Sequence, residues 1–112
     1  MKEITSINEF NKLDIRVGTI VSANDFPEAK NKSYKLEVDF GSVICIKKTS
    51  AQITTYYKKE DLIGKQVLGI VNLPPRQIAN FLSEFLVLGT YSGENVILIK
   101  PDIPVQNGDI LG

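Results

Sequence analysis

The chain has 112 residues, is 43% hydrophobic and carries no formal net charge. This length allows one buried core but is too short for two typical domains, so a single domain over residues 1–112 is expected. No apolar run approaches the roughly 18 to 20 residues of a membrane helix, and no signal-peptide core is visible, which predicts a soluble, cytoplasmic protein without membrane insertion. With no histidine and one cysteine, the chain lacks the commonest general base and zinc ligand, so we expect no enzyme, no metal site and no cofactor.

The first predicted element is a short helix. Ser6-Ile7-Asn8-Glu9 has the spacing of a capping box, which marks a helix start. Three apolar residues then fall on one side of the helix: Ile7, Phe10 and Leu13. We expect this helix to cover an open end or edge of the sheet that follows.

A meander of three strands is predicted next. Residues 14–23 alternate between apolar and polar side chains, with Gly18 suggesting a bend or bulge. Residues 34–40 show the clearest alternation, that of a half-buried strand. A turn at Gly41-Ser42 then leads into a hairpin partner at residues 43–49.

The third strand carries a thiol and two cations. Cys45 lies in the apolar run Val43-Ile44-Cys45-Ile46 and has no second cysteine to pair with, so we expect it to pack as a small hydrophobe. Lys47 and Lys48 follow at the far end of the strand, where they can leave the core and meet solvent or a ligand.

The second half of the chain predicts more short elements. Residues 56–63 suggest one or two helical turns that end at Gly64. Strands are expected at residues 66–72, 84–90 and 95–100. Several short strands with one inserted helical segment favour a small barrel, with a sandwich or an irregular sheet as alternatives.

The segment NLPPRQIANFLSEFLVLG at residues 72–89 is a polar loop between apolar strands, where binding residues often gather. The amide of Asn72 and the hydroxyl of Ser83 can donate and accept hydrogen bonds, and Arg76 can bind a phosphate with two donors. Alternatively, Asn72 caps a turn and Ser83 bonds to the loop backbone.

Charge is unevenly distributed along the chain. Residues 30–76 contain nine basic and four acidic side chains, net +5, whereas residues 1–29 sum to −2 and residues 77–112 to −3. The middle segment therefore either presents a positive face or belongs to an ordinary mixed surface.

Several separated motifs resemble one family. They are LDIRVGTI at residues 13–20, FPEA at 26–29, DFG at 39–41, TSAQIT at 49–54 and the segment at 72–89, and the chain also has Pro101-Asp102 and Asn107-Gly108 in the expected places. Together they are similar to the CsaA-type, stand-alone tRNA-binding-domain proteins over nearly the whole chain. The resemblance implies an all-β, five-stranded Greek-key OB-fold barrel with short helical segments and terminal extensions, a homodimer, and binding without catalysis.

The resemblance also implies roles for individual residues. Asn72, Arg76 and Ser83 match the family's signature positions and would contact RNA. Two positions depart from the family pattern. Asn80 stands in place of a glycine and tolerates a left-handed backbone. Phe85 replaces a methionine, and would either stack on a base or, as we favour, join the core.

Two alternative functions are therefore expected. The first is a dimeric tRNA-binding protein that recognises RNA by shape and backbone, with these contacts: Asn72, Arg76, Ser83, Lys30, Lys32, Lys47 and Lys48. The alternative is an export-related chaperone that binds unfolded peptides in an apolar groove lined by Phe81, Leu82 and Phe85.

Overall fold

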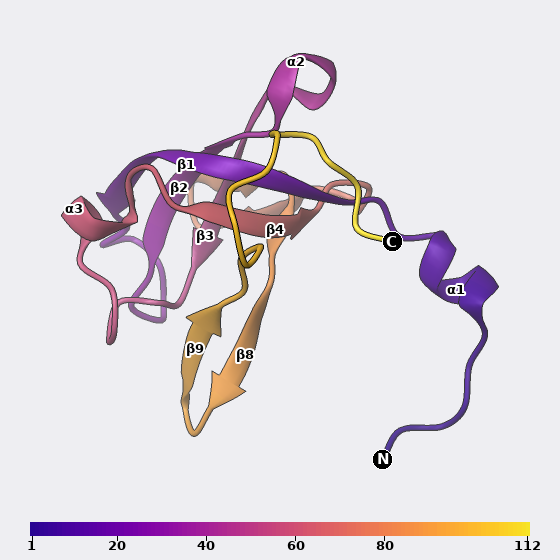
Figure 1. Ribbon diagram of the computed structural model, residues 1–112. Coiled ribbons are helices and arrows are strands. Elements are labelled where there is room, and N and C mark those ends of the chain that lie inside the picture. Colours follow the sequence, from indigo (N-terminus) through magenta and orange to yellow (C-terminus); the bar gives the residue numbers. More distant parts are fainter.

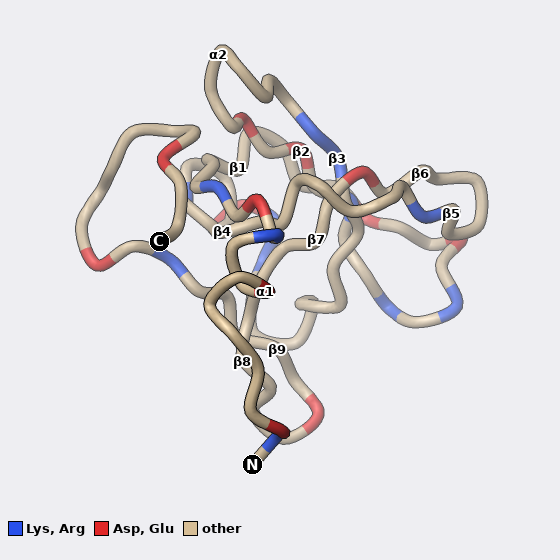
Figure 2. Tube along the Cα trace, turned by 90° about the vertical axis from the view of Figure 1, so that its right-hand side faces the viewer, with Lys and Arg blue, Asp and Glu red and all other residues tan.

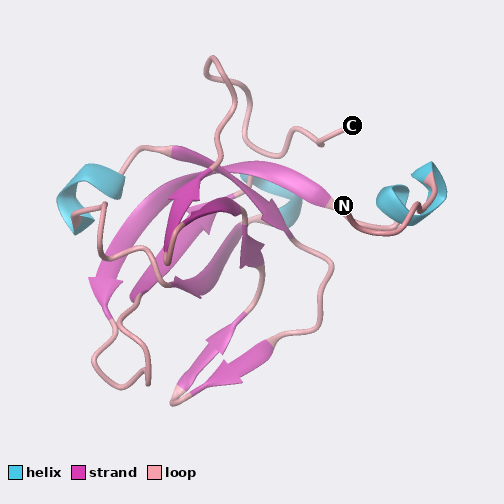
Figure 3. Ribbon diagram, turned by 90° about the horizontal axis from the view of Figure 1, so that it is seen from below, coloured by secondary structure: helices cyan, strands magenta, loops and turns pink.

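A nearly closed antiparallel barrel forms the centre of the computed structural model, which describes residues 1–112 (Figures 1 and 3). Its strands lie in the order β3-β2-β1-β4-β7. Their bounds are β1 (Ile15–Asp25), β2 (Tyr34–Asp39), β3 (Ile46–Ala51), β4 (Gln66–Ile70) and β7 (Leu86–Val87). The connection after β3 crosses to the other side of β1, so β4 pairs with β1 rather than with β3. The predicted all-β class, the meander and the fourth strand are confirmed.

β1 is long enough to pair with both of its neighbours. Its first half, Ile15 to Thr19, pairs with β4, and its second half, Thr19 to Asp25, pairs with β2. The register shifts between Ile20 and Ser22, so the predicted irregularity lies after Gly18 rather than at it. Gly18 has another role: an added Cβ would lie 2.5 Å from a methyl carbon of Val38, which leaves no room for a side chain.

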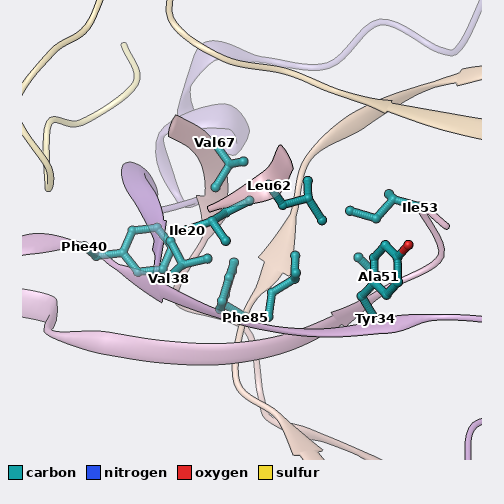
Figure 4. Close-up of a cluster of buried hydrophobic side chains, with 10 residues drawn as sticks. Ile20, Tyr34, Val38, Phe40, Ala51, Ile53, Leu62, Val67 and Phe85 are labelled. Carbon is teal, nitrogen blue, oxygen red and sulfur yellow. The ribbon is translucent and has the colours of Figure 1, made fainter. Parts of the chain in front are cut away.

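The barrel interior holds one main apolar cluster (Figure 4). It contains Ile20, Tyr34, Leu36, Val38, Phe40, Ala51, Ile53, Leu62, Val67 and Phe85. The rings of Phe40 and Phe85 meet edge to face, with centroids 4.9 Å apart. Leu62, from the short helix α3 (Lys59–Leu62), is fully buried, so this helix anchors the connection between β3 and β4.

Side chains close the barrel where β3 meets the chain before β7. The Thr49 hydroxyl lies 2.9 Å from that of Ser83, and it donates to the Phe85 carbonyl at 2.8 Å. Glu84 also bonds to β3: its amide donates to the Lys48 carbonyl at 2.8 Å, and its carboxylate accepts from the Lys48 amide at 3.0 Å. This seam replaces a regular strand pair between β3 and β7.

Two hairpins leave the barrel. The first, β5 (Arg76–Ile78) with β6 (Phe81–Ser83), lies in a segment that we expected to be a loop. In its turn the left-handed residue is Ala79, with φ of 52°, and Asn80 has no positive φ, so its tolerance of a left-handed backbone is not used. The second, β8 (Gly89–Ser92) with β9 (Asn95–Leu98), projects below the barrel in Figure 1, so the predicted strand at 84–90 is divided between β7 and β8.

The C-terminal segment runs along the first half of β1, where β2 no longer pairs with it. The Val17 amide donates to the Asp109 carbonyl, and the Leu111 amide donates to the Ile15 carbonyl, both at 2.9 Å. A second apolar cluster lies beside this segment, formed by Ile15, Val17, Leu68 and Ile70. Phe10 and Leu88 pack against the second cluster.

The helix α1 (Ile7–Asn11) is capped as predicted, because the Ser6 hydroxyl accepts from the Glu9 amide at 3.2 Å. However, α1 stands away from the barrel in Figure 1 and contains no buried residue. The expectation that it covers the sheet holds only for Phe10, which is half-buried. Ile7 is 69% exposed, since no element of the chain lies over it.

The chain between β2 and β3 differs from the predicted hairpin turn. It forms a single helical turn, α2 (Gly41–Ile44), which ends at Cys45 with a left-handed φ of 69°. Because α2 points away from the barrel, Cys45 is exposed, and its predicted burial is wrong. The glycine expected to end the other predicted helix, Gly64, has a φ of 89° two residues after α3.

None of the helices has the length and apolar character that crossing a lipid bilayer requires.

Candidate nucleic-acid interface

The outer face of β1, β2 and β3 forms a shallow pocket against the β5–β6 hairpin. Its volume is about 210 Å³. It is lined by Ser22, Asn24, Lys35, Leu36, Glu37, Lys48 and Phe81. The strands present these polar residues because alternate side chains of a strand point to opposite faces, and the apolar set fills the barrel.

Two phenylalanine rings form the apolar side of this region. Phe26, which follows β1, is buried, and its ring centroid lies 5.3 Å from that of Phe81 on β6. A lysine ammonium group lies near each ring: Lys35 Nζ is 5.5 Å from the Phe26 centroid and Lys48 Nζ is 5.4 Å from the Phe81 centroid. Cation–π attraction thus holds two positive charges beside an aromatic surface.

Further cations lie on segments that adjoin the pocket. Lys30 and Lys32 are exposed in the loop that follows Phe26, and Arg76 is exposed on β5. None of these three takes part in the ion pairs of the structure. In Figure 2 the side of the molecule that carries β3 and the β5–β6 hairpin contains several of the basic segments. We name the basic face by these residues: Lys30, Lys32, Lys35, Lys48 and Arg76.

The structure separates the two lysines of β3. In the strand register, Lys48 lies opposite Glu37 of β2, and both side chains face outward. Lys47 lies opposite Val38, whose side chain fills the core. Adjacent residues of a strand point to opposite faces. Lys47 therefore leaves from the other face of β3 and lies outside the basic face.

Asn72 binds the chain itself. Its amide oxygen accepts from the Asp14 amide, and its amide nitrogen donates to the Lys12 carbonyl, both at 2.8 Å. The side chain thereby fixes the segment between α1 and β1 to the end of β4. The geometry favours the alternative in which Asn72 is a scaffold residue.

Two other candidate residues are buried. Ser83 is 9% exposed and its hydroxyl is bonded within the barrel seam. Phe85 is 5% exposed and its ring lies in the core cluster (Figure 4). The expectation that Phe85 lines an open peptide groove is therefore wrong, because Gly69 leaves space for its ring inside the barrel. Leu82 is 39% exposed and Phe81 half-buried, so these two remain accessible.

The region also contains four residues that were not among the predicted site residues: Lys35, Glu37, Asn24 and Phe26. For Lys35 and Glu37 a signal was present, because both occupy polar positions of the alternating strand 34–40. Phe26 and Asn24 could not be assigned to the site from the sequence. They lie more than 50 residues before Phe81 in the chain, and only the closed barrel brings them to the β5–β6 hairpin.

Two ion pairs outside the basic face hold neighbouring segments. The carboxylate of Asp14 bonds to the Arg16 guanidinium at 2.7 Å and raises the pKa of Arg16. The hydrogen bond from Lys59 to Asp25, at 2.8 Å, raises the pKa of Lys59, although partial burial acts in the opposite direction. The Lys59 pair links α3 to the end of β1.

No group of three or more Cys, Asp or Glu side chains comes together that could hold a metal ion.

The sequence matches the model of the family described as "Putative tRNA binding domain" over residues 15–110. The chain belongs to this family. A methionine–tRNA ligase of Thermococcus kodakarensis is 39% identical over 106 residues, which are 95% of this chain but 14% of that ligase. The chain therefore spans about a seventh of the length of this relative.

Solved structures confirm the barrel type. The CsaA chaperone of Picrophilus torridus is 48% identical, with a TM-score of 0.92 over 97% of this chain and 100% of that chain. The chaperone CsaA of Bacillus anthracis is 40% identical, with a TM-score of 0.93 over 98% of this chain and 100% of that chain. Both the predicted OB-like barrel and the predicted resemblance to CsaA-type tRNA-binding-domain proteins are confirmed.

Proposed function

We propose that this protein binds tRNA in the cytoplasm without catalysing a reaction, and that a single domain over residues 1–112 suffices. The observation that carries the proposal is the basic face: its five cations take part in no ion pair, and two of them, Lys35 and Lys48, lie near phenylalanine rings. It lies on the strand face and loops that OB-fold proteins use for oligonucleotides. Membership of the tRNA-binding-domain family supports the same function.

The basic face suits a phosphate backbone. Each lysine or arginine that neutralises a phosphate releases a condensed counterion, which makes binding strongly salt-dependent. The zero net charge of the chain does not oppose this, because the potential near a surface depends on local charges within about 10 Å at 0.1 M salt.

The test is the affinity for tRNA, measured by filter binding across a salt series. We expect the wild type to bind at low salt, and Lys35→Gln or Lys48→Gln to weaken binding and to reduce the salt slope by about one unit for each phosphate that the variant no longer neutralises. Lys100→Gln, at an exposed lysine beyond β9, is the matched control. Absence of tRNA binding by the wild type at low salt would refute the proposal.

We also propose a homodimer, supported by the second apolar cluster. Apolar side chains next to its strands stay exposed: Leu13, just before β1, is 39% exposed, Leu86, paired with Ile70, 49%, and Ile110, paired with Arg16, 66%. An isologous contact over this surface would cover them in both protomers. Sedimentation equilibrium at micromolar concentration should give twice 12.4 kDa; a mass of 12.4 kDa alone would contradict the dimer.

The second candidate function is peptide binding, favoured by the likeness to two solved structures of CsaA chaperones. Of the three residues expected to line a peptide groove, Phe81 and Leu82 are accessible and Phe85 is buried. Suppression of aggregation of a denatured client protein, compared with an inert protein of similar size, is the test. Unchanged aggregation would exclude this function.

A further inference from the structure

The pocket on the basic face contains polar groups that phosphate binding does not require. Glu37, on β2, places a carboxylate among the lysines, and one of its oxygens accepts a hydrogen bond from the Ser22 hydroxyl at 2.7 Å. The other oxygen has no partner, and neither Lys35 nor Lys48 forms an ion pair with Glu37. The amide of Asn24 is also without a hydrogen bond. Thus the pocket offers a free acceptor and a free amide beside a ring.

A carboxylate is an unfavourable neighbour for a phosphate but a good acceptor for an amino group. Carboxylate side chains accept hydrogen bonds from the exocyclic amino group of a base such as cytosine. The ring of Phe81 provides a surface on which a base can stack when the Lys48 ammonium, which lies 5.4 Å from the ring centroid, turns away toward a phosphate.

We propose that this pocket takes one unpaired nucleobase that carries an exocyclic amino group. The base stacks on Phe81, the free oxygen of Glu37 accepts a hydrogen bond from its amino group, and Lys35 and Lys48 neutralise the flanking phosphates. A base within a helix has its faces covered by stacking, so the ligand is a single-stranded segment of the RNA. The inference rests on the proposed tRNA binding and adds a base preference to it.

The decisive comparison is between cytosine, which has an amino group at C4 and an acceptor at N3, and uracil, which has a carbonyl at C4 and a donor at N3, so that only cytosine presents an exocyclic amino group. Fluorescence anisotropy with labelled hexamers of cytidine and of uridine, at one low salt concentration, measures this preference. We expect the cytidine hexamer to bind at least about fivefold more tightly. Equal affinities of the wild type for the two hexamers would overturn the proposal.

Two variants test the assigned roles. Glu37→Gln should bring the cytidine-to-uridine affinity ratio close to one, since an amide can donate as well as accept, whereas Glu94→Gln at the tip of the β8–β9 hairpin should keep the wild-type ratio. Phe81→Leu retains an apolar contact with Phe26 and should weaken both hexamers by about fivefold or more. An unchanged ratio in Glu37→Gln, or unchanged affinities in a folded Phe81→Leu protein, would overturn the roles of these residues.

Measuring tRNA binding under the same conditions separates this inference from the proposed function. Binding of tRNA without a preference for cytidine refutes the base pocket and leaves the tRNA function standing. A preference for cytidine without tRNA binding supports the pocket and refutes the tRNA function.

Discussion

The hydroxyl groups of Thr49 and Ser83 meet at 2.9 Å inside the barrel, although 34 residues separate them in sequence. Thr49 is 1% exposed and also donates to the Phe85 carbonyl, so this contact joins β3 to the chain that leads into β7. Ser83 is therefore part of the seam that closes the barrel, and the basic face rests on the strands that this seam joins.

Replacing Ser83 with alanine should lower the free energy of unfolding by about 1 kcal/mol, because a buried hydrogen bond is removed while Thr49 keeps its bond to Phe85. Urea denaturation measures this change, with Ser92→Ala on the exposed β8 strand as control. The affinity for tRNA should stay within about twofold of wild type. A large fall in affinity without a fall in stability would instead identify Ser83 as an RNA contact.

Asn72→Ala should release the segment before β1, since it removes the hydrogen bond that the Asn72 side chain accepts from the Asp14 amide and the one that it donates to the Lys12 carbonyl. We expect faster amide hydrogen exchange in residues 7–14 and a decrease in stability of about 1 kcal/mol. Gln52→Ala, at an exposed position whose side chain makes no hydrogen bond, is the control. Exchange rates that match the wild type would show that the two hydrogen bonds of the Asn72 side chain do not stabilise the segment before β1.

Phe85→Leu should destabilise the protein by about 1 to 3 kcal/mol, because the smaller side chain leaves part of the space beside Phe40 empty. It should not change peptide capture by the folded protein.

Leu82→Ser should give the opposite result. Because Leu82 is 39% exposed, the variant should change stability by less than about 0.5 kcal/mol and reduce any peptide capture. The reverse pattern would place Phe85, not Leu82, at the ligand surface.

The pKa of Lys59 should fall toward its ordinary value of 10.5 in the Asp25→Asn variant, since the hydrogen bond to Asp25 is the main cause of its elevation. A raised pKa means that the pair contributes stability below the ordinary pKa and that this stability disappears as the pH rises through the raised value. Titration of the lysine side chains by NMR tests this. A Lys59 pKa that is the same in both proteins would rule out the pair as the cause.

Periodicity predicted much of the fold. The alternation of residues 34–40 identified β2, the capping box identified α1, and Gly64 marked the end of α3. These signals are local, because each arises within one element. The β5–β6 hairpin was missed because the run Arg76 to Ser83 contains no alternation or glycine turn, and Ala79 adopts the left-handed conformation that glycine usually supplies.

The candidate site was harder to predict because the relevant contacts are long-range. The polar character of Asn72 and Ser83 indicated hydrogen bonding, but their partners at residues 12, 14 and 49 are set by how the barrel closes. Likewise, strand alternation puts Lys47 and Lys48 on opposite faces, but only the register of β3 with β2 shows that Lys48 is the one on the basic face. Residue type thus indicated the chemistry, whereas burial and partners required the fold.

Binding of tRNA by the basic face is tested most directly by amide chemical-shift changes in the isotopically labelled protein on addition of tRNA. We expect the largest changes on the basic face, in residues 30–37, at Lys48 and in residues 76–82. Changes confined to α1 and the β8–β9 hairpin, with residues 30–37 and Lys48 unaffected, would contradict this assignment.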